Sequence, residues 1–359
     1  MNQEQISSLI FVPNRLPPVS MDIPTYFLPQ IWFAILGICL FFYIMLDGFN
    51  LGVGILSLTA SSAEHRSLLI NSLSYVWAAN EAWLVLMGGA LSGAFPLAYT
   101  VIFNALHIPA IIMLVGLAFR AVAFKFRKSS GNKLFWDIAF GTGSLLAALA
   151  QGFALGAVFK GLTVNEVGNF TGRAWDWLSW QSGLVALTLI QGYILMGSTY
   201  LILKNRETPQ AVHYRAAKIS ALMTLIGAVF VTISSPILYE KLRRGLLSSP
   251  KVYLFSSVLT LGILLIWCLI KSLNQQQKAA PFVWNILIVM VSFLGLGLTV
   301  FPVIIPPSIT IYEAATSPRS MVLMLIFVGT LIPLLLVYSI YQYVAFLINR
   351  LKWIIAVLS

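Results

Sequence analysis

Long runs of apolar residues alternate with short polar stretches along almost the whole chain. A helix needs about 20 mostly apolar residues to cross the hydrocarbon core of a bilayer. Charged residues or proline clusters, which end helices, bound nine such runs. The runs lie at about Ile31–Leu51, Leu69–Leu91, Thr100–Val122, Trp136–Val158, Trp180–Leu203, Ala216–Leu238, Val252–Ile270, Val283–Ile305 and Ser320–Ile348. This pattern predicts an all-α integral membrane protein with about nine transmembrane helices.

The composition excludes most other classes of protein. Of 359 residues, 59% are hydrophobic and 9% are charged, and the mean hydropathy is +0.90. An ordinary soluble domain is about 25% charged, and so few polar side chains could not cover this much apolar surface. Soluble enzymes, disordered chains and nucleic-acid-binding domains are therefore excluded. The net charge of +11 is interpreted as basic loops that face the cytoplasm.

The basic residues also predict an orientation. An odd number of spans puts the two termini on opposite sides of the membrane. With the N-terminus outside, 14 of the 22 Lys and Arg residues fall on the inner side, which favours a periplasmic N-terminus and a cytoplasmic C-terminus. Residues 1–20 lack the features of a secretory signal and are expected to form a disordered extension. Met21 is thus an alternative start to Met1, and residues 21–359 are expected to form one transmembrane domain.

Three charged residues fall where a bilayer disfavours charge. Asp47 and Glu81 lie in the first and second runs, and Arg120 closes the third. A charge at the bilayer centre costs about 2.5–3.5 kcal/mol, so such residues are expected to pair with one another. The glycines beside the acids should let helices approach closely. They are Gly48, Gly52, Gly54, Gly88 and Gly89.

We expect a buried polar cluster of Asp47, Glu81 and Arg120, with Asn80 and Trp77 shaping it. Two interpretations stay open for this cluster. It carries protons, as intramembrane acids often do, or it is a charge-compensated contact that only fixes helix packing.

Metal ligands are scarce in this chain. It has three histidines and two cysteines, Cys39 and Cys268, without a CxxC pair. Haem and copper sites in membranes usually need several imidazoles, so this chain is not expected to hold a set of metal centres alone. His107 is the one histidine inside an expected span. Haem ligation is the weaker interpretation of His107, and a packing or interfacial role is favoured.

The segment FPVIIPPSITIYEAATSP (301–318) differs from the other connections. Its prolines, including Pro306 and Pro307, end the preceding helix and prevent a plain helical loop. Glu313 lies in the same external turn. A surface that faces a partner chain and a turn that merely stops a helix are the two interpretations, and the second is slightly favoured.

Several segments resemble one known family when they are taken together. LDGFNLGVG, VWAANEAWLVLMGGALSGAFPLAY, FRAVAFKFR and FPVIIPPSITIYEAA are similar to subunit II of cytochrome bd-type ubiquinol oxidases. QGFALGAVFKGL and GYILMGSTYLILK extend the similarity and favour the cyanide-insensitive branch of that family. These motifs occur in order from about residue 21 to residue 350, which makes the resemblance much more specific than any one motif.

The resemblance implies a two-subunit oxidase of the bacterial inner membrane that oxidises quinol and reduces oxygen to water. In that family haem b and haem d belong to subunit I. Subunit II completes the complex and offers a proton route from the cytoplasm. The resemblance thus implies a haem-bearing partner, no redox centre in this chain alone, and room for small accessory subunits or for a bound quinone or lipid.

This chain departs from the family pattern at functional positions. The family's DGFD motif is Asp47-Gly48-Phe49-Asn50 here, so its second acid is an amide. The family's W-D-x-N-E/Q-x-W motif has Ala78 in place of the acid expected in the proton route. Glu81 lies three residues further on, one turn along the same helical face. We expect Glu81, helped by Asn80, to take over the relay. The family's late Trp-Asp pair is Tyr312-Glu313.

Two alternatives to this function remain at the level of the sequence. In a secondary transporter, Asp47 and Glu81 would couple ions to a solute, and inverted repeats with broken helices would be expected. Glycine-rich breaks are visible in the first half only. In a divergent or purely structural subunit, the same acids would have no part in proton transfer.

Overall fold

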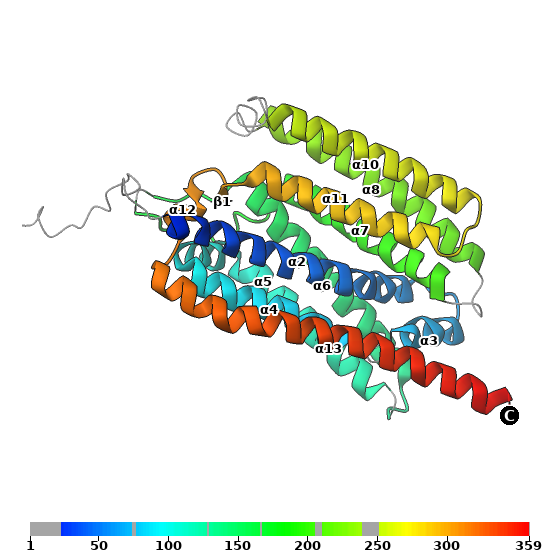
Figure 1. The fold of residues 1–359 in the computed structure, drawn as a ribbon. Helices are drawn as coiled ribbons and strands as arrows, with labels where there is room; N and C mark the ends of the chain where they lie inside the picture. Colours follow the sequence, from blue (N-terminus) through cyan, green and yellow to red (C-terminus); the bar gives the residue numbers. More distant parts are fainter. Residues whose placement is uncertain are drawn as a thin grey trace, which may run out of the picture.

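The computed structural model describes residues 23–73, 77–127, 129–165, 167–204, 210–238 and 251–358. The expected extension at residues 1–20, and Met21 itself, lie outside this part. Helices make up most of the described chain, and they run side by side as one bundle (Figure 1). The helices are α2 (Ile23–Leu58), α3 (Ala63–Ser72), α4 (Trp77–Ala94), α5 (Pro96–Phe126), α6 (Lys133–Lys160), α7 (Trp180–Lys204), α8 (Gln210–Leu238), α10 (Lys251–Asn274), α11 (Ala280–Val300), α12 (Ile311–Ala314) and α13 (Pro318–Leu358).

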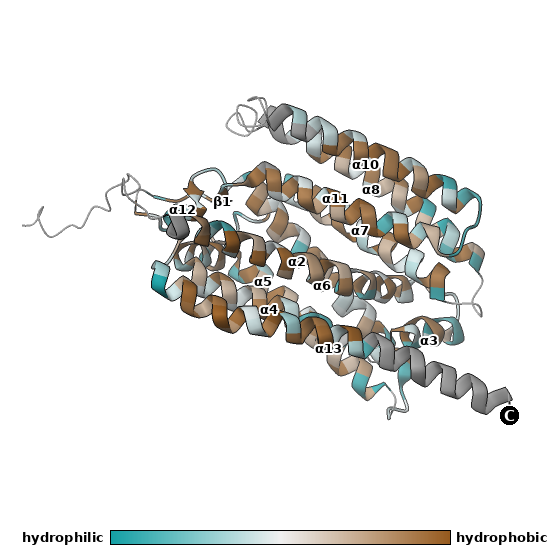
Figure 2. Cartoon of the chain, viewed as in Figure 1, coloured by the Kyte–Doolittle hydropathy of each residue, from teal (hydrophilic) through white to brown (hydrophobic). Residues whose placement is uncertain are grey.

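Hydrophobic residues dominate the long helices, and hydrophilic residues gather near the helix ends (Figure 2). In the described chain, eight helices are long and apolar enough to cross a membrane. They are α2, α5, α6, α7, α8, α10, α11 and α13. The expected all-α, multi-pass fold is confirmed. The count of nine spans and the orientation of the termini stay predictions.

The second expected span, Leu69–Leu91, has wrong bounds. The short helix α3 ends at Ser72, and the next helix, α4, begins at Trp77. Lys204 and Tyr200 of α7 both donate hydrogen bonds to the carbonyl of Ser72. These bonds satisfy a carbonyl at the end of α3 from another helix, so α3 can end there. α4 then runs along α2 and α13 (Figure 1).

Glycine permits the closest helix contacts. A Cβ on Gly52 of α2 would lie 1.8 Å from the backbone oxygen of Tyr193 in α7, so no side chain fits there. Gly116 of α5 and Gly143 of α6 meet in the same way. The expected close approach at Gly48, Gly52 and Gly54 is confirmed. Gly88 and Gly89 make no such contact within the described chain, where a Cβ on either would have no atom within 4 Å.

The proline-rich segment folds as a small cap over one end of the bundle. β1 (Val303–Ile305) pairs antiparallel with β2 (Ile309–Thr310), and α12 follows directly. Ile305, Ile309 and Ile311 are buried in the apolar core at that end. The backbone N–H of Leu162 donates to the carbonyl of Pro306 over 3.1 Å. The turn is thus tied to the end of α6, and the C-terminal end of α13 lies at the opposite end of the bundle (Figure 1).

Candidate functional site

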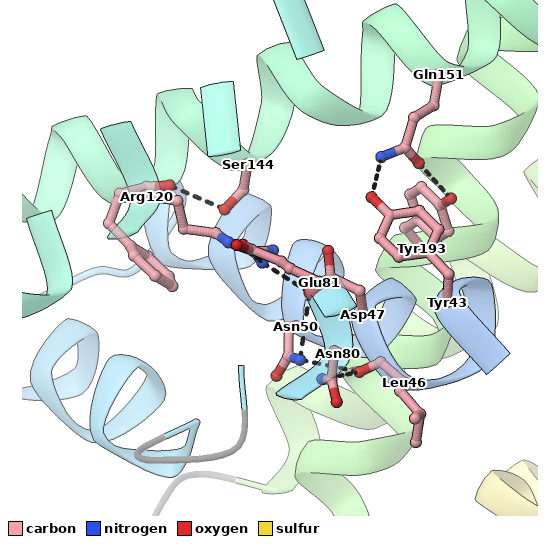
Figure 3. A network of polar contacts seen from close by, with 11 residues as sticks. Tyr43, Leu46, Asp47, Asn50, Asn80, Glu81, Arg120, Ser144, Gln151 and Tyr193 are labelled. Carbon is pink, nitrogen blue, oxygen red and sulfur yellow. Dashed lines mark hydrogen bonds and ion pairs between the residues drawn. The ribbon is translucent and has the colours of Figure 1, made fainter. Parts of the chain in front are cut away.

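The three charged residues from the first three expected spans meet inside the bundle (Figure 3). One guanidinium nitrogen of Arg120, Nη2, lies 2.7 Å from Oδ1 of Asp47 and 3.0 Å from Oε1 of Glu81. Asp47 comes from α2, Glu81 from α4 and Arg120 from α5. A single cation therefore holds three helices together through two acids.

These charges are buried to different degrees. The side chains of Asp47 and Arg120 are 0% and 2% exposed, whereas that of Glu81 is 27% exposed. Burying an ion costs several kcal/mol unless it is paired, and one guanidinium compensates one carboxylate in full. The second carboxyl group of the cluster is therefore the natural place for an exchangeable proton. Glu81 is the acid with access to the outside of the cluster.

Two asparagine amides extend the cluster. The Nδ2 atoms of Asn80 and Asn50 donate to the carbonyl of Leu46 over 2.7 and 2.9 Å (Figure 3). Asn80 thereby links the first turns of α4 to α2, next to Asp47. The indole of Trp83, on the same helix, stacks on Phe42 at 4.7 Å between ring centroids. Trp77 is the first residue of α4, but its side chain lies outside the described part of the structure.

Several buried polar atoms of the cluster have no protein partner among the described residues. They are Asp47 Oδ2, Asn50 Oδ1, Asn80 Oδ1, Arg120 Nε and Arg120 Nη1. Buried polar groups in proteins are almost always hydrogen-bonded, to protein or to water. A site that offers acceptors and donors side by side is suited to internal water molecules. Such water molecules would connect the charged groups and let protons move between them.

A second buried network lies beside the first, and the sequence reading missed it. Gln151 of α6 bridges Tyr43 of α2 and Tyr193 of α7, with both hydrogen bonds 2.6 Å long (Figure 3). One signal could have found it. Tyr43 precedes Asp47 by four residues, so the two share a helical face.

A further buried ion pair lies near the end of α5, and the sequence reading did not single it out. Nε of Arg127 contacts Oδ1 of Asp137 in α6, and Nη2 donates to the hydroxyl of Ser67 in α3 over 2.6 Å. Both charged side chains are at most 8% exposed. The contacts of Arg127 thus connect the end of α5 to α6 and α3.

His107 lies apart from the cluster. It is exposed on α5, and its Nδ1 lies 3.0 Å from the carbonyl of Asn104 in its own helix. The described residues contain no group of three or more His, Cys, Asp or Glu side chains that could hold a metal ion. This placement gives no support to haem ligation by His107.

Glu313 has a local structural role in the external turn. Its Oε2 accepts hydrogen bonds from the backbone N–H of Thr310 at 2.7 Å and from the Thr310 hydroxyl at 2.9 Å. The Thr310 hydroxyl in turn accepts from the N–H of Glu313, which completes a capping box at the start of α12. Pro306 is half-buried and Pro307 is exposed. Contact of this turn with a partner stays a prediction.

Comparison with known proteins places this arrangement in a family. Residues 28–346 match the family model of cytochrome bd terminal oxidase subunit II. Cytochrome bd-I ubiquinol oxidase subunit 2 of Escherichia coli K12 is 27% identical over 354 residues, which cover 87% of this chain and 92% of that protein. Cytochrome bd ubiquinol oxidase subunit 2 of Bacillus subtilis 168 is 26% identical and covers 89% of this chain and 96% of its own.

A solved structure shows the same fold. A chain of the bd oxidase from Geobacillus thermodenitrificans superposes with a TM-score of 0.73 at 21% sequence identity. The match covers 90% of the chain described here and 99% of the other.

Proposed function

The chain belongs to the family of cytochrome bd terminal oxidase subunit II, and from this premise we propose how it serves the oxidase. It is a subunit of an oxidoreductase complex. It pairs with a haem-bearing subunit I in the bacterial inner membrane, where the complex oxidises quinol and reduces oxygen to water. Haem b and haem d reside in subunit I. This chain stabilises that partner and supplies a proton route.

The buried contact of Asp47, Arg120 and Glu81 carries the proposal of a proton route. Two carboxyl groups share one guanidinium nitrogen. When one of the two carboxyl groups carries a proton, the cluster has no net charge, so holding this proton costs little free energy in the membrane. Unpartnered acceptors and donors beside them leave places for water. A contact that served packing alone would be expected to satisfy these atoms within the protein.

Glu81 takes the part of the acid that the family pattern has at the position of Ala78. A methyl group cannot bind or release a proton. Three residues along a helix amount to about 4.5 Å of rise. Positions three apart are also neighbours on the helix surface, so Glu81 shares a face of α4 with position 78, and it contacts Arg120 directly.

Replacing Glu81 tests this route. We expect Glu81→Gln to preserve assembly and haem content and to lower the rate of oxygen consumption by about 100-fold, the scale of a lost proton-transfer group. Glu64→Gln is the matched control, because Glu64 is an exposed acid in the first turn of α3. A second variant, Ala78→Asp in the Glu81→Gln background, restores an acid at the family position and should recover part of the rate. Full oxygen consumption in Glu81→Gln at normal haem content would contradict the proposal.

Purification of the tagged chain from detergent-solubilised membranes tests the pairing. A larger subunit should co-elute, and its reduced-minus-oxidised spectrum should show haem b and the long-wavelength band of haem d. Extraction of the same preparation would identify any bound quinone, lipid or accessory subunit. A haem-free preparation without a large partner would instead favour a transporter or a divergent subunit.

A further inference from the structure

In the buried network of Tyr43, Gln151 and Tyr193, both hydrogen bonds run in the same direction along the chain of side chains. Nε2 of Gln151 donates to the hydroxyl oxygen of Tyr43, and the hydroxyl of Tyr193 donates to Oε1 of Gln151. An amide has a donor side and an acceptor side, so it orients the two hydroxyls differently. Tyr193 uses its hydroxyl proton in the hydrogen bond to Gln151. Tyr43 accepts from Gln151 and keeps its proton for another acceptor.

The nearest turn of the same helix offers such an acceptor. Asp47 follows Tyr43 by four residues, which places both side chains on one face of α2 (Figure 3). One carboxylate oxygen of Asp47 is held by Arg120, and the other, Oδ2, has no protein partner in the described part of the chain. Asp47 is 0% exposed, so this oxygen needs a donor from within the bundle.

The packing around Gly48 keeps the tyrosine pair in place. A Cβ on Gly48 would lie 3.0 Å from Cε1 of Tyr193 and 2.9 Å from Sδ of Met196. The glycine that follows Asp47 therefore lets the ring of Tyr193 lie against α2. Tyr43 and Tyr193 are each 2% exposed. Their hydroxyls are thus positioned by packing as well as by Gln151.

We infer that Tyr43 donates through one internal water molecule to Oδ2 of Asp47, and that Gln151 and Tyr193 orient Tyr43 for this contact. The inference rests on the proposed function and deepens it. With Arg120 on one oxygen and the water on the other, both carboxylate oxygens of Asp47 accept hydrogen bonds. The exchangeable proton of the cluster then resides on Glu81. Tyr43, Gln151 and Tyr193 are positioning residues that decide which of the two acids moves protons.

Infrared difference spectroscopy of the purified oxidase can locate this proton. The carboxylic-acid C=O band that the cluster shows in the wild-type complex should be lost in Glu81→Gln. In Tyr43→Phe, loss of a hydrogen bond to a charged group should shift the proton toward Asp47 by about tenfold or more. A new C=O band should then appear, and the additional replacement Asp47→Asn should remove it.

Two further variants separate orientation from general disturbance of the fold. Tyr193→Phe removes the donor to Gln151 but leaves Gln151 bound to Tyr43, so its spectrum should fall between those of the wild type and Tyr43→Phe. Tyr214→Phe is the matched control, since the Tyr214 hydroxyl donates to the carbonyl of Gln276, away from the cluster. Its spectrum should equal that of the wild type.

The same spectra can overturn the inference. If folded Tyr43→Phe complex with normal haem content shows no new band, Tyr43 does not support the charge of Asp47. If Tyr43→Phe does not assemble, the intermediate spectrum expected of Tyr193→Phe decides the question in the same way. The proposed proton route fails separately, when Glu81→Gln consumes oxygen at the full rate. The two failures are therefore distinguishable.

Discussion

Arg120 lies near the end of α5 and Arg127 directly follows its last residue, and the two arginines use their nitrogens in different ways. Arg120 makes both ionic contacts through Nη2, and its Nε and Nη1 have no partner in the described structure. Arg127 contacts Asp137 through Nε and Ser67 through Nη2. The first arrangement leaves bonding capacity for water, whereas the second bonds more fully within the protein. This contrast supports the proposal of proton exchange at the cluster around Arg120, and it predicts a stabilising role for Arg127.

Removing one partner of the Arg127–Asp137 pair should destabilise the complex strongly. Arg127→Met leaves an unpaired carboxylate among buried residues, a change that costs about 3–5 kcal/mol. The double variant Arg127→Met, Asp137→Leu removes both charges and should recover most of that loss. Thermal unfolding of the purified complex measures both effects. Equal loss in the single and double variants would show that the ion pair itself stabilises the fold.

The sequence predicted the charged cluster of Asp47, Glu81 and Arg120, but not the neutral network beside it. Asp47, Glu81 and Arg120 stand out because charge inside an apolar run demands compensation. Tyr43, Gln151 and Tyr193 carry no charge, and each is a minor interruption of its hydrophobic run. Their partnership depends on the mutual position of α2, α6 and α7. That position follows from tertiary packing, which no local pattern contains.

Helices α2 and α7 touch through their backbones, and this contact makes a clear prediction. Gly52→Ala forces a methyl group against the Tyr193 carbonyl, so the helices must separate. Overpacking of this kind costs about 1–3 kcal/mol or more. Gly89→Ala is the matched control, because its Cβ meets no atom of the described chain, and the effect on stability should stay within about 0.5 kcal/mol.

Yield and thermal unfolding of the assembled complex measure this difference. A strong loss in Gly89→Ala would place that face of α4 against the partner subunit. An unchanged Gly52→Ala complex would contradict the backbone contact.

The elements that hydropathy predicted best are those with long uninterrupted runs. The bounds failed at α3 and α4, where a single apolar run continues through a break in the helix. Lys204 and Tyr200 satisfy the carbonyl of Ser72 from a helix that is more than 100 residues away in sequence. A hydropathy profile averages over a window of neighbouring residues, so it cannot detect a helix end that is stabilised by hydrogen bonds from a distant helix. The eighth expected span, Val283–Ile305, also has a wrong bound: α11 ends at Val300, and Val303–Ile305 forms strand β1. Hydropathy extended the span because apolar strand residues resemble the end of an apolar helix.

On the scale of the whole molecule, the orientation in the membrane can be tested at the two ends of the bundle. Ser61 follows α2 and Ser308 lies between β1 and β2, and both are exposed. In a chain whose Cys39 and Cys268 are replaced, Ser308→Cys should react with a membrane-impermeant maleimide on intact spheroplasts. Ser61→Cys should react only after the membrane is opened. The reverse pattern would show that the N-terminus faces the cytoplasm.

The order in which the cluster is synthesised has a consequence for biogenesis. Asp47 and Glu81 leave the ribosome before Arg120, which follows Glu81 by 39 residues and supplies their shared cation. Until α5 arrives, each acid faces the full cost of a lone charge in lipid. We therefore expect α2 and α4 to stay near the insertion machinery, or to carry Asp47 and Glu81 in protonated form, until α5 is inserted. The ion pairs of Arg120 with Asp47 and Glu81 can therefore form only after α5 has been inserted.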